Sequence, residues 1–226
     1  MSERVAVVYD IHGNLSALQA VLDEAEAEGF DRLLCGGDMA MLGPDPAACI
    51  DLLRSYGDRL TAIRGNTDRW VASDQPDDSA AWTRAAVGTQ RSAWLGSLPP
   101  TVALERHDLL AVHATPRSDQ DIITPETPDQ EVEGELAGVD RHTVLYGHIH
   151  IQYRRTVGGI ELVNPGSVGL PFDGDRRAAW ATVEDGAVGL RRTAYPVDVT
   201  IAAVSARAMP RGEWITETLR TALRAV

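Results

Sequence analysis

Residues of the types that bind metal ions cluster in two short motifs. In "DIHGN" (10–14) an aspartate stands two residues before a histidine, and "GHIH" (147–150) contains two histidines in a chain that has only six. Carboxylate and imidazole groups are common metal ligands. The alternative for each motif alone is a solvated histidine in a surface loop. The remaining motifs decide between a metal site and this alternative.

Three further motifs place ligand-type residues directly after short apolar runs. Asp38 lies in "CGGDM", Asn66 in "RGNTD", and His113 ends "LLAVH". Asp10, Asp38 and Asn66 are evenly spaced, 28 residues apart. A single "GD" or "GN" is most simply a turn. Their joint recurrence after predicted strands favours a shared site, because ligands of open α/β sheets bind at the carboxyl ends of the strands.

The ligand types and their number predict two metal ions. Mixed carboxylate, imidazole and amide ligands suit Mn²⁺, Fe or Zn²⁺, whereas sets made only of oxygen suit Mg²⁺ or Ca²⁺. Seven ligands exceed what one tetrahedral zinc takes, and they fit two ions that share a carboxylate. His107 and His142 fall outside the pattern. The predicted metal ligands are Asp10, His12, Asp38, Asn66, His113, His148 and His150.

The first third of the chain has the pattern that would position these residues. Residues 4–64 alternate between β-branched apolar runs and two amphipathic helical segments, which predicts β-α-β-α-β with a parallel sheet. Asn14 is predicted to cap the first helix, and Asp45 with Pro46 to start the second.

The rest of the chain is predicted to contain two helices, a long loop and several short strands. A helix to about Leu98 precedes two paired strands, and residues 114–130 form a long loop, which in a compact domain is more often functional than idle. Several short strands then suggest an antiparallel set, followed by an amphipathic helix at about 212–226. With no internal repeat, residues 1–226 are predicted to form a single domain.

Composition excludes several function classes. The net charge is −12 and the pI about 4.9, which argues against binding to DNA, RNA or an anionic membrane surface. All 21 basic residues are arginine, so a Walker-type phosphate loop and a Schiff-base lysine are excluded. Two cysteines, no signal peptide and no apolar stretch long enough for a membrane span predict a cytoplasmic protein.

Taken together, "DIHGN", "GGD", "GNTD", "VHATP" and "GHIH" resemble, in order, the motifs of the calcineurin-like metallophosphoesterase superfamily. The resemblance extends from Val5 to about Val183. It implies an α/β fold of four layers, α-β-β-α, with two facing mixed sheets. It also implies that a metal-bridging hydroxide attacks phosphorus in line. One ion would be held by Asp10, His12, Asp38 and His150, and the other by Asp38, Asn66, His113 and His148.

The resemblance also suggests that the protein has phosphodiesterase activity. "GNTD" carries Asp68 where phosphatases of the superfamily often have a histidine, and this resembles the small bacterial and archaeal phosphodiesterase branch. A carboxylate cannot stabilise leaving-group charge as an imidazolium can. Weak turnover of monoesters with poor leaving groups is therefore expected. The residues predicted to be catalytic are Asp38, Asn66, Asp68 and His113.

The sequence indicates the substrate contacts and the substrate class less clearly than it indicates the metal ligands. Arg64 and Arg117 are candidates for binding substrate phosphate together with Asn66, although either arginine could instead pair with a carboxylate. The expected substrate is a small phosphate ester or a nucleotide, and the expected cofactor is two Mn²⁺ ions, with Fe, Zn²⁺ or Ni²⁺ as alternatives. A dinucleoside polyphosphate hydrolase, a phosphoprotein phosphatase and a non-enzymatic scaffold are the competing hypotheses. A homo-oligomer stays open, because Trp82 or Trp94 could lie at an interface.

Overall fold

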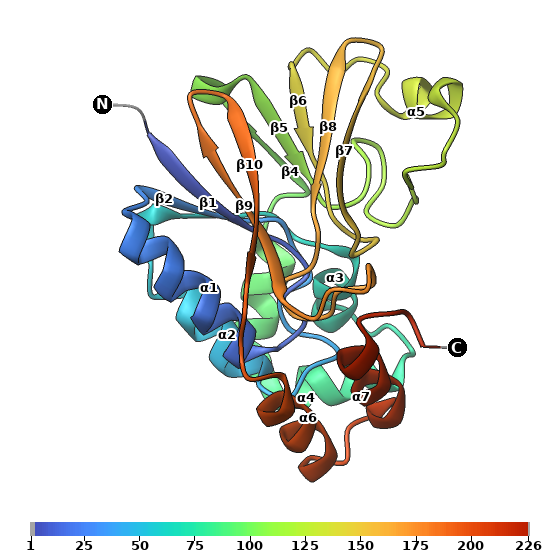
Figure 1. Cartoon of the computed structure of the whole chain (residues 1–226). Helices are drawn as coiled ribbons and strands as arrows, with labels where there is room; N and C mark the ends of the chain where they lie inside the picture. Colours follow the sequence, from blue (N-terminus) through green and yellow to red (C-terminus); the bar gives the residue numbers. More distant parts are fainter. Residues whose placement is uncertain (1–2, 226) are drawn as a thin grey trace.

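Two mixed β-sheets face each other in the computed structural model, which describes residues 3–225 (Figure 1). The first sheet has the strand order β10-β9-β1-β2-β3 and the second the order β4-β5-β6-β8-β7. The strands of the first sheet are β1 (Arg4–Val8), β2 (Arg32–Cys35), β3 (Leu60–Ala62), β9 (Ala178–Glu184) and β10 (Ala187–Thr193). Those of the second are β4 (Thr101–Leu104), β5 (Leu109–Val112), β6 (Thr143–Leu145), β7 (Gln152–Val157) and β8 (Ile160–Pro165).

Helices cover the outer faces of both sheets. The helices are α1 (Leu15–Glu28), α2 (Pro46–Arg54), α3 (Asn66–Ala72), α4 (Asp78–Ser97), α5 (Asp129–Glu135), α6 (Val197–Ala206) and α7 (Gly212–Thr221). Helices α1 and α2 lie on the first sheet, and α5 lies beside β7 and β8 of the second (Figure 1). None of the helices in the described part of the chain is long and apolar enough to cross a membrane.

Alternation along the strands explains this layering. In β1, Val5 and Val7 pack with Leu109, Leu145 and other residues of the second sheet in a core between the sheets. Their neighbours Ala6 and Val8 face the other way and pack against α1 and α2. Because successive side chains of a strand point to opposite faces, an uninterrupted apolar strand supplies two cores at once. The four-layer fold expected from the sequence is confirmed.

The β-α-β-α-β prediction for residues 4–64 is also confirmed. Strand β1 pairs in parallel with β2, and β2 with β3. The Asn14 side chain accepts a hydrogen bond from the backbone N–H of Ala17 and caps α1. Pro46 begins α2, but the Asp45 carboxylate makes no capping hydrogen bond. It pairs instead with Arg207, just after α6, at 2.5 Å.

The prediction of one antiparallel set after the long loop was wrong. Strand β6 pairs in parallel with both β5 and β8, whereas β9 and β10 belong to the first sheet, where β9 pairs antiparallel with β1. Local patterns cannot assign these pairings, because a strand pattern does not show which strand lies beside it, and the partner of β9 lies more than 170 residues earlier in the chain. The short helices α3 and α5, and α6, were not anticipated. The predicted C-terminal helix is α7, which ends at Thr221; Val226 lies outside the described residues.

Candidate metal centre

Six of the seven predicted ligand residues lie in loops after β1, β2, β5 and β6, and Asn66 follows β3 as the first residue of α3. Their side chains form two groups where the carboxyl ends of these strands from both sheets meet. The donor atoms of Asp10, His12 and His150 lie within 4.8 Å of one another, and so do those of Asp38, His113 and His148. Six of the seven residues are buried, and His148 is partly exposed. Residues that are far apart in the sequence therefore come together in two adjacent groups that are shielded from solvent.

In the first group, two imidazole nitrogens face each other. The Nε2 atoms of His12 and His150 are 3.0 Å apart, and the Nε2 atom of His150 lies 3.6 Å from Oδ1 of Asp10. Asp38 is near this group as well, because its Oδ2 atom lies 3.8 Å from Nε2 of His12.

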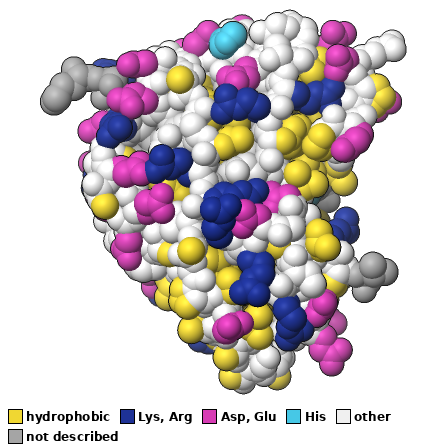
Figure 2. Space-filling model, in the orientation of Figure 1, with side chains coloured by type: hydrophobic (Ala, Val, Ile, Leu, Met, Phe, Trp, Pro, Cys, Tyr) yellow, Lys and Arg dark blue, Asp and Glu magenta, His cyan; other side chains and the backbone are white. Residues whose placement is uncertain are grey.

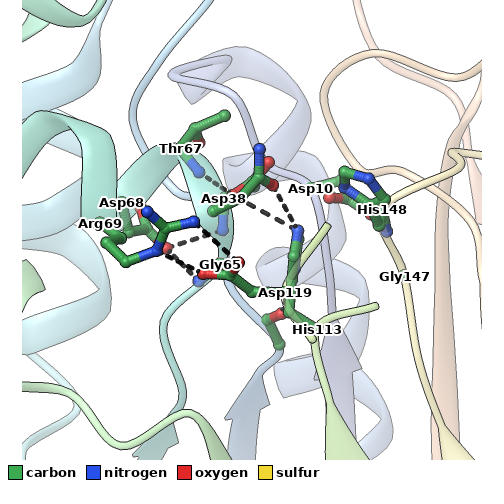
Figure 3. A network of polar contacts seen from close by, with 12 residues as sticks. Asp10, Asp38, Gly65, Thr67, Asp68, Arg69, His113, Asp119, Gly147 and His148 are labelled. Atoms are coloured by element: carbon green, nitrogen blue, oxygen red, sulfur yellow. Dashed lines mark hydrogen bonds and ion pairs between the residues drawn. The ribbon is translucent and has the colours of Figure 1, made fainter. Parts of the chain in front are cut away.

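In the second group, Nε2 of His113 lies 3.5 Å from Oδ1 of Asp38 and 3.0 Å from Oδ1 of Asn66. The Asp38 carboxylate lies between His113 and the backbone N–H of Thr67, which donates to Oδ1 (Figure 3). The two oxygens of Asp38 are thus turned to different groups, Oδ2 to the first and Oδ1 to the second.

The hydrogen bonds of the histidines show that these residues fit a cation. Nδ1 of His12 donates to the carbonyl of Met41, Nδ1 of His150 to that of Leu170, and Nδ1 of His113 to that of Gly36. A carbonyl can only accept, so in the neutral rings each Nε2 carries a lone pair and no proton. Two such nitrogens 3.0 Å apart repel each other unless a cation lies between them. The buried Oδ1 atom of Asp10, which has no hydrogen-bond partner, is consistent with the same conclusion.

The backbone at the ligands is in a conformation that most residues avoid. Five of the seven have positive φ angles: Asp10 (51°), His12 (47°), Asp38 (54°), His148 (69°) and His150 (58°). Outside glycine, this left-handed region is sparsely populated, and such strain concentrates at functional sites. In "GHIH", both histidines need it to direct their rings into the centre.

Two glycines in the motifs are required by close packing. A Cβ atom on Gly65 would lie 2.1 Å from Oδ1 of Asp38, and one on Gly147 would lie 2.6 Å from Oδ2 of Asp10. Any larger residue would push the carboxylates out of place. The glycines of "GN" and "GH" therefore make room for the ligands.

Burial and neighbouring charges shift the pKa values of the titratable side chains in this centre. Burial raises the pKa of Asp10 to about 8, and it lowers the pKa values of His12 and His150. Burial would also lower the pKa of His113, but nearby Asp38 outweighs it and raises this pKa to about 10. The buried carboxylates thus favour positive charge beside them. Divalent ions would supply it.

Asp68, predicted to be catalytic, accepts hydrogen bonds from three backbone donors. Its Oδ2 atom accepts from the N–H groups of Asp38 (2.8 Å) and Gly65 (2.9 Å), and its Oδ1 atom accepts from that of Met39 (3.0 Å). The side chain is fully buried. It therefore ties the loop after β2 to the start of α3, and it holds the backbone of Asp38, whose carboxylate faces both groups.

The arginines predicted to bind substrate lie beside the second group. Arg64 and Arg117 both line a cavity whose wall includes His113. The sequence did not indicate the role of Arg69 on α3. This arginine forms a bidentate ion pair with Asp119 of the long loop, with nitrogen–oxygen distances of 2.7 and 2.8 Å (Figure 3). The "RGNTDR" motif contained this arginine, but its partner 50 residues later gave no local signal.

The C-terminal helix α7 supports the first group through an aromatic contact. The ring of Phe172 stacks on His150 with centroids 4.3 Å apart, and Trp214 of α7 packs edge-on against Phe172 at 6.2 Å. The loop between β8 and β9, which carries Phe172, also supplies the Leu170 carbonyl that orients His150. Nothing in the sequence predicted that α7 would contact this loop.

Comparison with known proteins identifies relatives over most of the chain. An uncharacterized protein of Methanocaldococcus jannaschii is 26% identical, with 95% of this chain and 96% of that protein covered. The symmetrical bis(5'-nucleosyl)-tetraphosphatase of Glaesserella parasuis is 29% identical over 69% of this chain and 61% of its own length. The phosphodiesterase YfcE of Escherichia coli K12 is 28% identical over 74% and 79%.

A solved structure and a family profile agree with these relatives. The metallophosphoesterase from Sphaerobacter thermophilus superposes with a TM-score of 0.81 at 25% identity, covering 98% of this chain and all of that one (100%). The profile of the calcineurin-like phosphoesterase superfamily domain matches residues 4–186. This span contains every residue of the two groups. The chain belongs to the calcineurin-like phosphoesterase superfamily.

Proposed function

We propose that this protein is a phosphodiesterase that depends on two divalent metal ions. Asp10, His12, Asp38 and His150 would hold one ion, and Asp38, Asn66, His113 and His148 the other. The observation that carries the proposal is the pair of unprotonated Nε2 atoms 3.0 Å apart, beside a carboxylate that is turned to both groups. The mixed nitrogen and oxygen ligands favour Mn²⁺, with Fe, Zn²⁺ or Ni²⁺ as alternatives.

When bound, the two ions supply positive charge for the phosphate oxygens and make water a stronger nucleophile at neutral pH. The protein's residues do the rest. The Nδ1 bonds to carbonyls hold three histidines in the tautomer that directs Nε2 to the centre. The Asn66 oxygen is turned to His113, which leaves its amide N–H₂ for a phosphate oxygen.

The contacts of Asp68 bear on the choice of substrate. Its oxygens already accept three backbone N–H groups, so this carboxyl is engaged where relatives with a histidine could protonate a leaving group. Leaving groups that depart readily as anions should therefore react fastest. A diester with an aryl leaving group, or a dinucleoside polyphosphate that releases a nucleotide through its phosphate, satisfies this condition better than an alkyl monoester, and better than the side chain of a phosphoserine.

The relatives support the same assignment without deciding the substrate. Two of them are named as a phosphodiesterase and as a dinucleoside tetraphosphatase. All seven ligand residues are present and converge, which argues against a scaffold that has lost its metals. The free, buried thiols of Cys35 and Cys49 support a reducing compartment such as the cytoplasm.

The test is hydrolysis of bis-p-nitrophenyl phosphate by metal-stripped protein, with Mn²⁺, Ni²⁺, Zn²⁺ or Mg²⁺ added back in turn. Activity should return with metal, and p-nitrophenyl phosphate, a phosphopeptide and a dinucleoside polyphosphate provide the comparison. His148→Ala should lower kcat/KM at least about 100-fold and reduce the bound metal below two ions per chain. His142→Ala is the matched control, since His142 is exposed and lies at the start of β6, away from the site. Full activity of His148→Ala, or faster turnover of alkyl monoesters than of diesters, would refute the proposal.

A further inference from the structure

A cavity of about 490 Å³ opens beside the second metal group. Its wall includes the predicted ligand His113, the start of β4 at Thr101, and the loop residues Arg117 and Asp119. Arg64, just after β3, lines it as well. A group bound in this cavity would thus lie next to one bound at the metals. Its volume exceeds that of a single phosphate group, so the cavity can also accommodate part of an ester group.

Arg64 and Arg117 belong to the minority of arginines in this acidic protein that carry no carboxylate partner within residues 3–225. Of its 21 arginines, 15 form an ion pair with a carboxylate among the described residues. Figure 2 shows the result on one face, where arginine and acidic side chains are interspersed. Within the described chain, neither Arg64 nor Arg117 has such a partner.

Most of the hydrogen-bonding capacity of these two side chains is also unused. Each makes one hydrogen bond to a backbone carbonyl, from Arg64 to Gly96 at 3.4 Å and from Arg117 to Gly134 at 3.2 Å. A guanidinium has five N–H donors in a planar fork that fits phosphate oxygens. Each arginine can therefore still bind an anion.

The remaining charge on the cavity wall does not cancel the two arginines. Among the described residues that line it, Asp119 alone is acidic, and its carboxylate is engaged by Arg69 at 2.7 and 2.8 Å. The ion pair of Arg69 and Asp119 is close to neutral as a unit. Arg64 and Arg117 then leave a local charge of about +2 in a chain whose net charge is −12.

We infer that the cavity lined by Arg64 and Arg117 binds a second phosphate group of the substrate, separate from the one at the metals. This inference rests on the proposed function, and it narrows the substrate to phosphodiesters that carry a further phosphate on one ester group. Two arginines match the two charges of a terminal phosphate. A simple diester would leave the cavity to solvent and would be a poorer substrate.

Two chromogenic diesters that differ in one group test the inference. The first is the p-nitrophenyl ester of thymidine 5'-phosphate, and the second carries an additional phosphate at O3'. The Mn²⁺-loaded protein should turn over the second with a kcat/KM at least about 10-fold higher, mainly through KM, and this preference should decline with added salt. Without a dedicated site, an acidic protein would repel the extra charge and prefer the first.

Arginine variants test whether the preference for the second phosphate arises in this cavity. Arg64→Gln combined with Arg117→Gln should abolish the preference, and Arg117→Gln alone, at an exposed position that does not threaten folding, should reduce it several-fold. Arg106→Gln is the matched control, because Arg106 is also without an ion pair among the described residues but lies between β4 and β5, at the far end of the sheet. An equal ratio of the two probes in wild type and double variant would overturn the inference.

A binding measurement separates this inference from the proposed function. If neither diester is hydrolysed, the phosphodiesterase proposal fails, but inorganic pyrophosphate can still be titrated into metal-stripped protein by calorimetry. Binding that is lost in the double variant and kept in Arg106→Gln would support an anion site. Absence of binding, or equal binding by the double variant, would refute it.

Discussion

Replacing Asp68 by asparagine distinguishes a positioning role from a catalytic one. The carboxylate accepts from the backbone N–H groups of Asp38, Met39 and Gly65. An amide has one acceptor oxygen, so at least one buried N–H would lose its partner and face another donor, which costs about 1 to 3 kcal/mol. The bonds that remain would lose charge assistance, at roughly 1 kcal/mol each.

Part of this cost is returned by relief of repulsion. Burial and the neighbouring Asp38 carboxylate raise the pKa of Asp68 to about 7, so its charge is unfavourable in the metal-stripped protein at pH 8. We therefore expect Asp68→Asn to lower the free energy of unfolding by about 2 to 4 kcal/mol. Because Asp38 is held at a φ of 54° by these bonds, metal affinity should fall about 10- to 100-fold.

The assay combines three measurements on one variant. Urea unfolding of metal-stripped protein, followed by tryptophan fluorescence, gives stability; calorimetric titration gives Mn²⁺ affinity; bis-p-nitrophenyl phosphate gives kcat at saturating metal. A positioning role predicts lower stability, weaker metal binding and recovery of much of kcat with excess Mn²⁺. Asp58→Asn, at an exposed position, should change none of them. Unchanged stability and metal affinity with a large loss of kcat would refute the reasoning and assign Asp68 a direct part in the reaction.

Three further predictions concern residues around the centre. Gly65→Ala should reduce metal binding to less than one ion per chain, because its Cβ would lie 2.1 Å from a ligand oxygen, whereas Gly134→Ala, with nothing within 4 Å, should be tolerated; equal metal content would contradict this. Trp214→Ala should destabilise the protein by about 2 kcal/mol and weaken binding of one metal, since the residue supports the loop that orients a histidine ligand; metal titration checks it. Arg69 lowers the pKa of Asp119, so this pair stabilises the fold above pH ~4 and is lost as pH falls further. Urea unfolding of Asp119→Asn should therefore show a loss of at most about 1 kcal/mol at pH 7, because both side chains are partly exposed, and this loss should disappear as the pH falls through the lowered pKa of Asp119.

The sequence by itself determined which residues could form the centre and which strands would carry them. Ligand-type residues directly after apolar, β-branched runs, with crossovers of helix length between them, predict that carboxyl ends of parallel strands meet at one edge. Asp10 and Asp38 follow neighbouring strands, so their approach required only local patterns and the handedness of crossovers. The proposed metal-ligand chemistry likewise follows from the residue types.

Tertiary structure decided the properties that depend on distant partners. The carbonyls that orient the histidines, the donors that engage Asp68 and the pairing of Arg69 with Asp119 come from segments that local patterns do not connect. The same holds for β9, whose pairing with β1 placed it in the first sheet. Which arginines stay without a carboxylate also follows only from packing, because charge balance along the sequence cannot show it. Hydrogen bonds and ion pairs act over a few ångströms, so they depend on where the folded chain brings residues together.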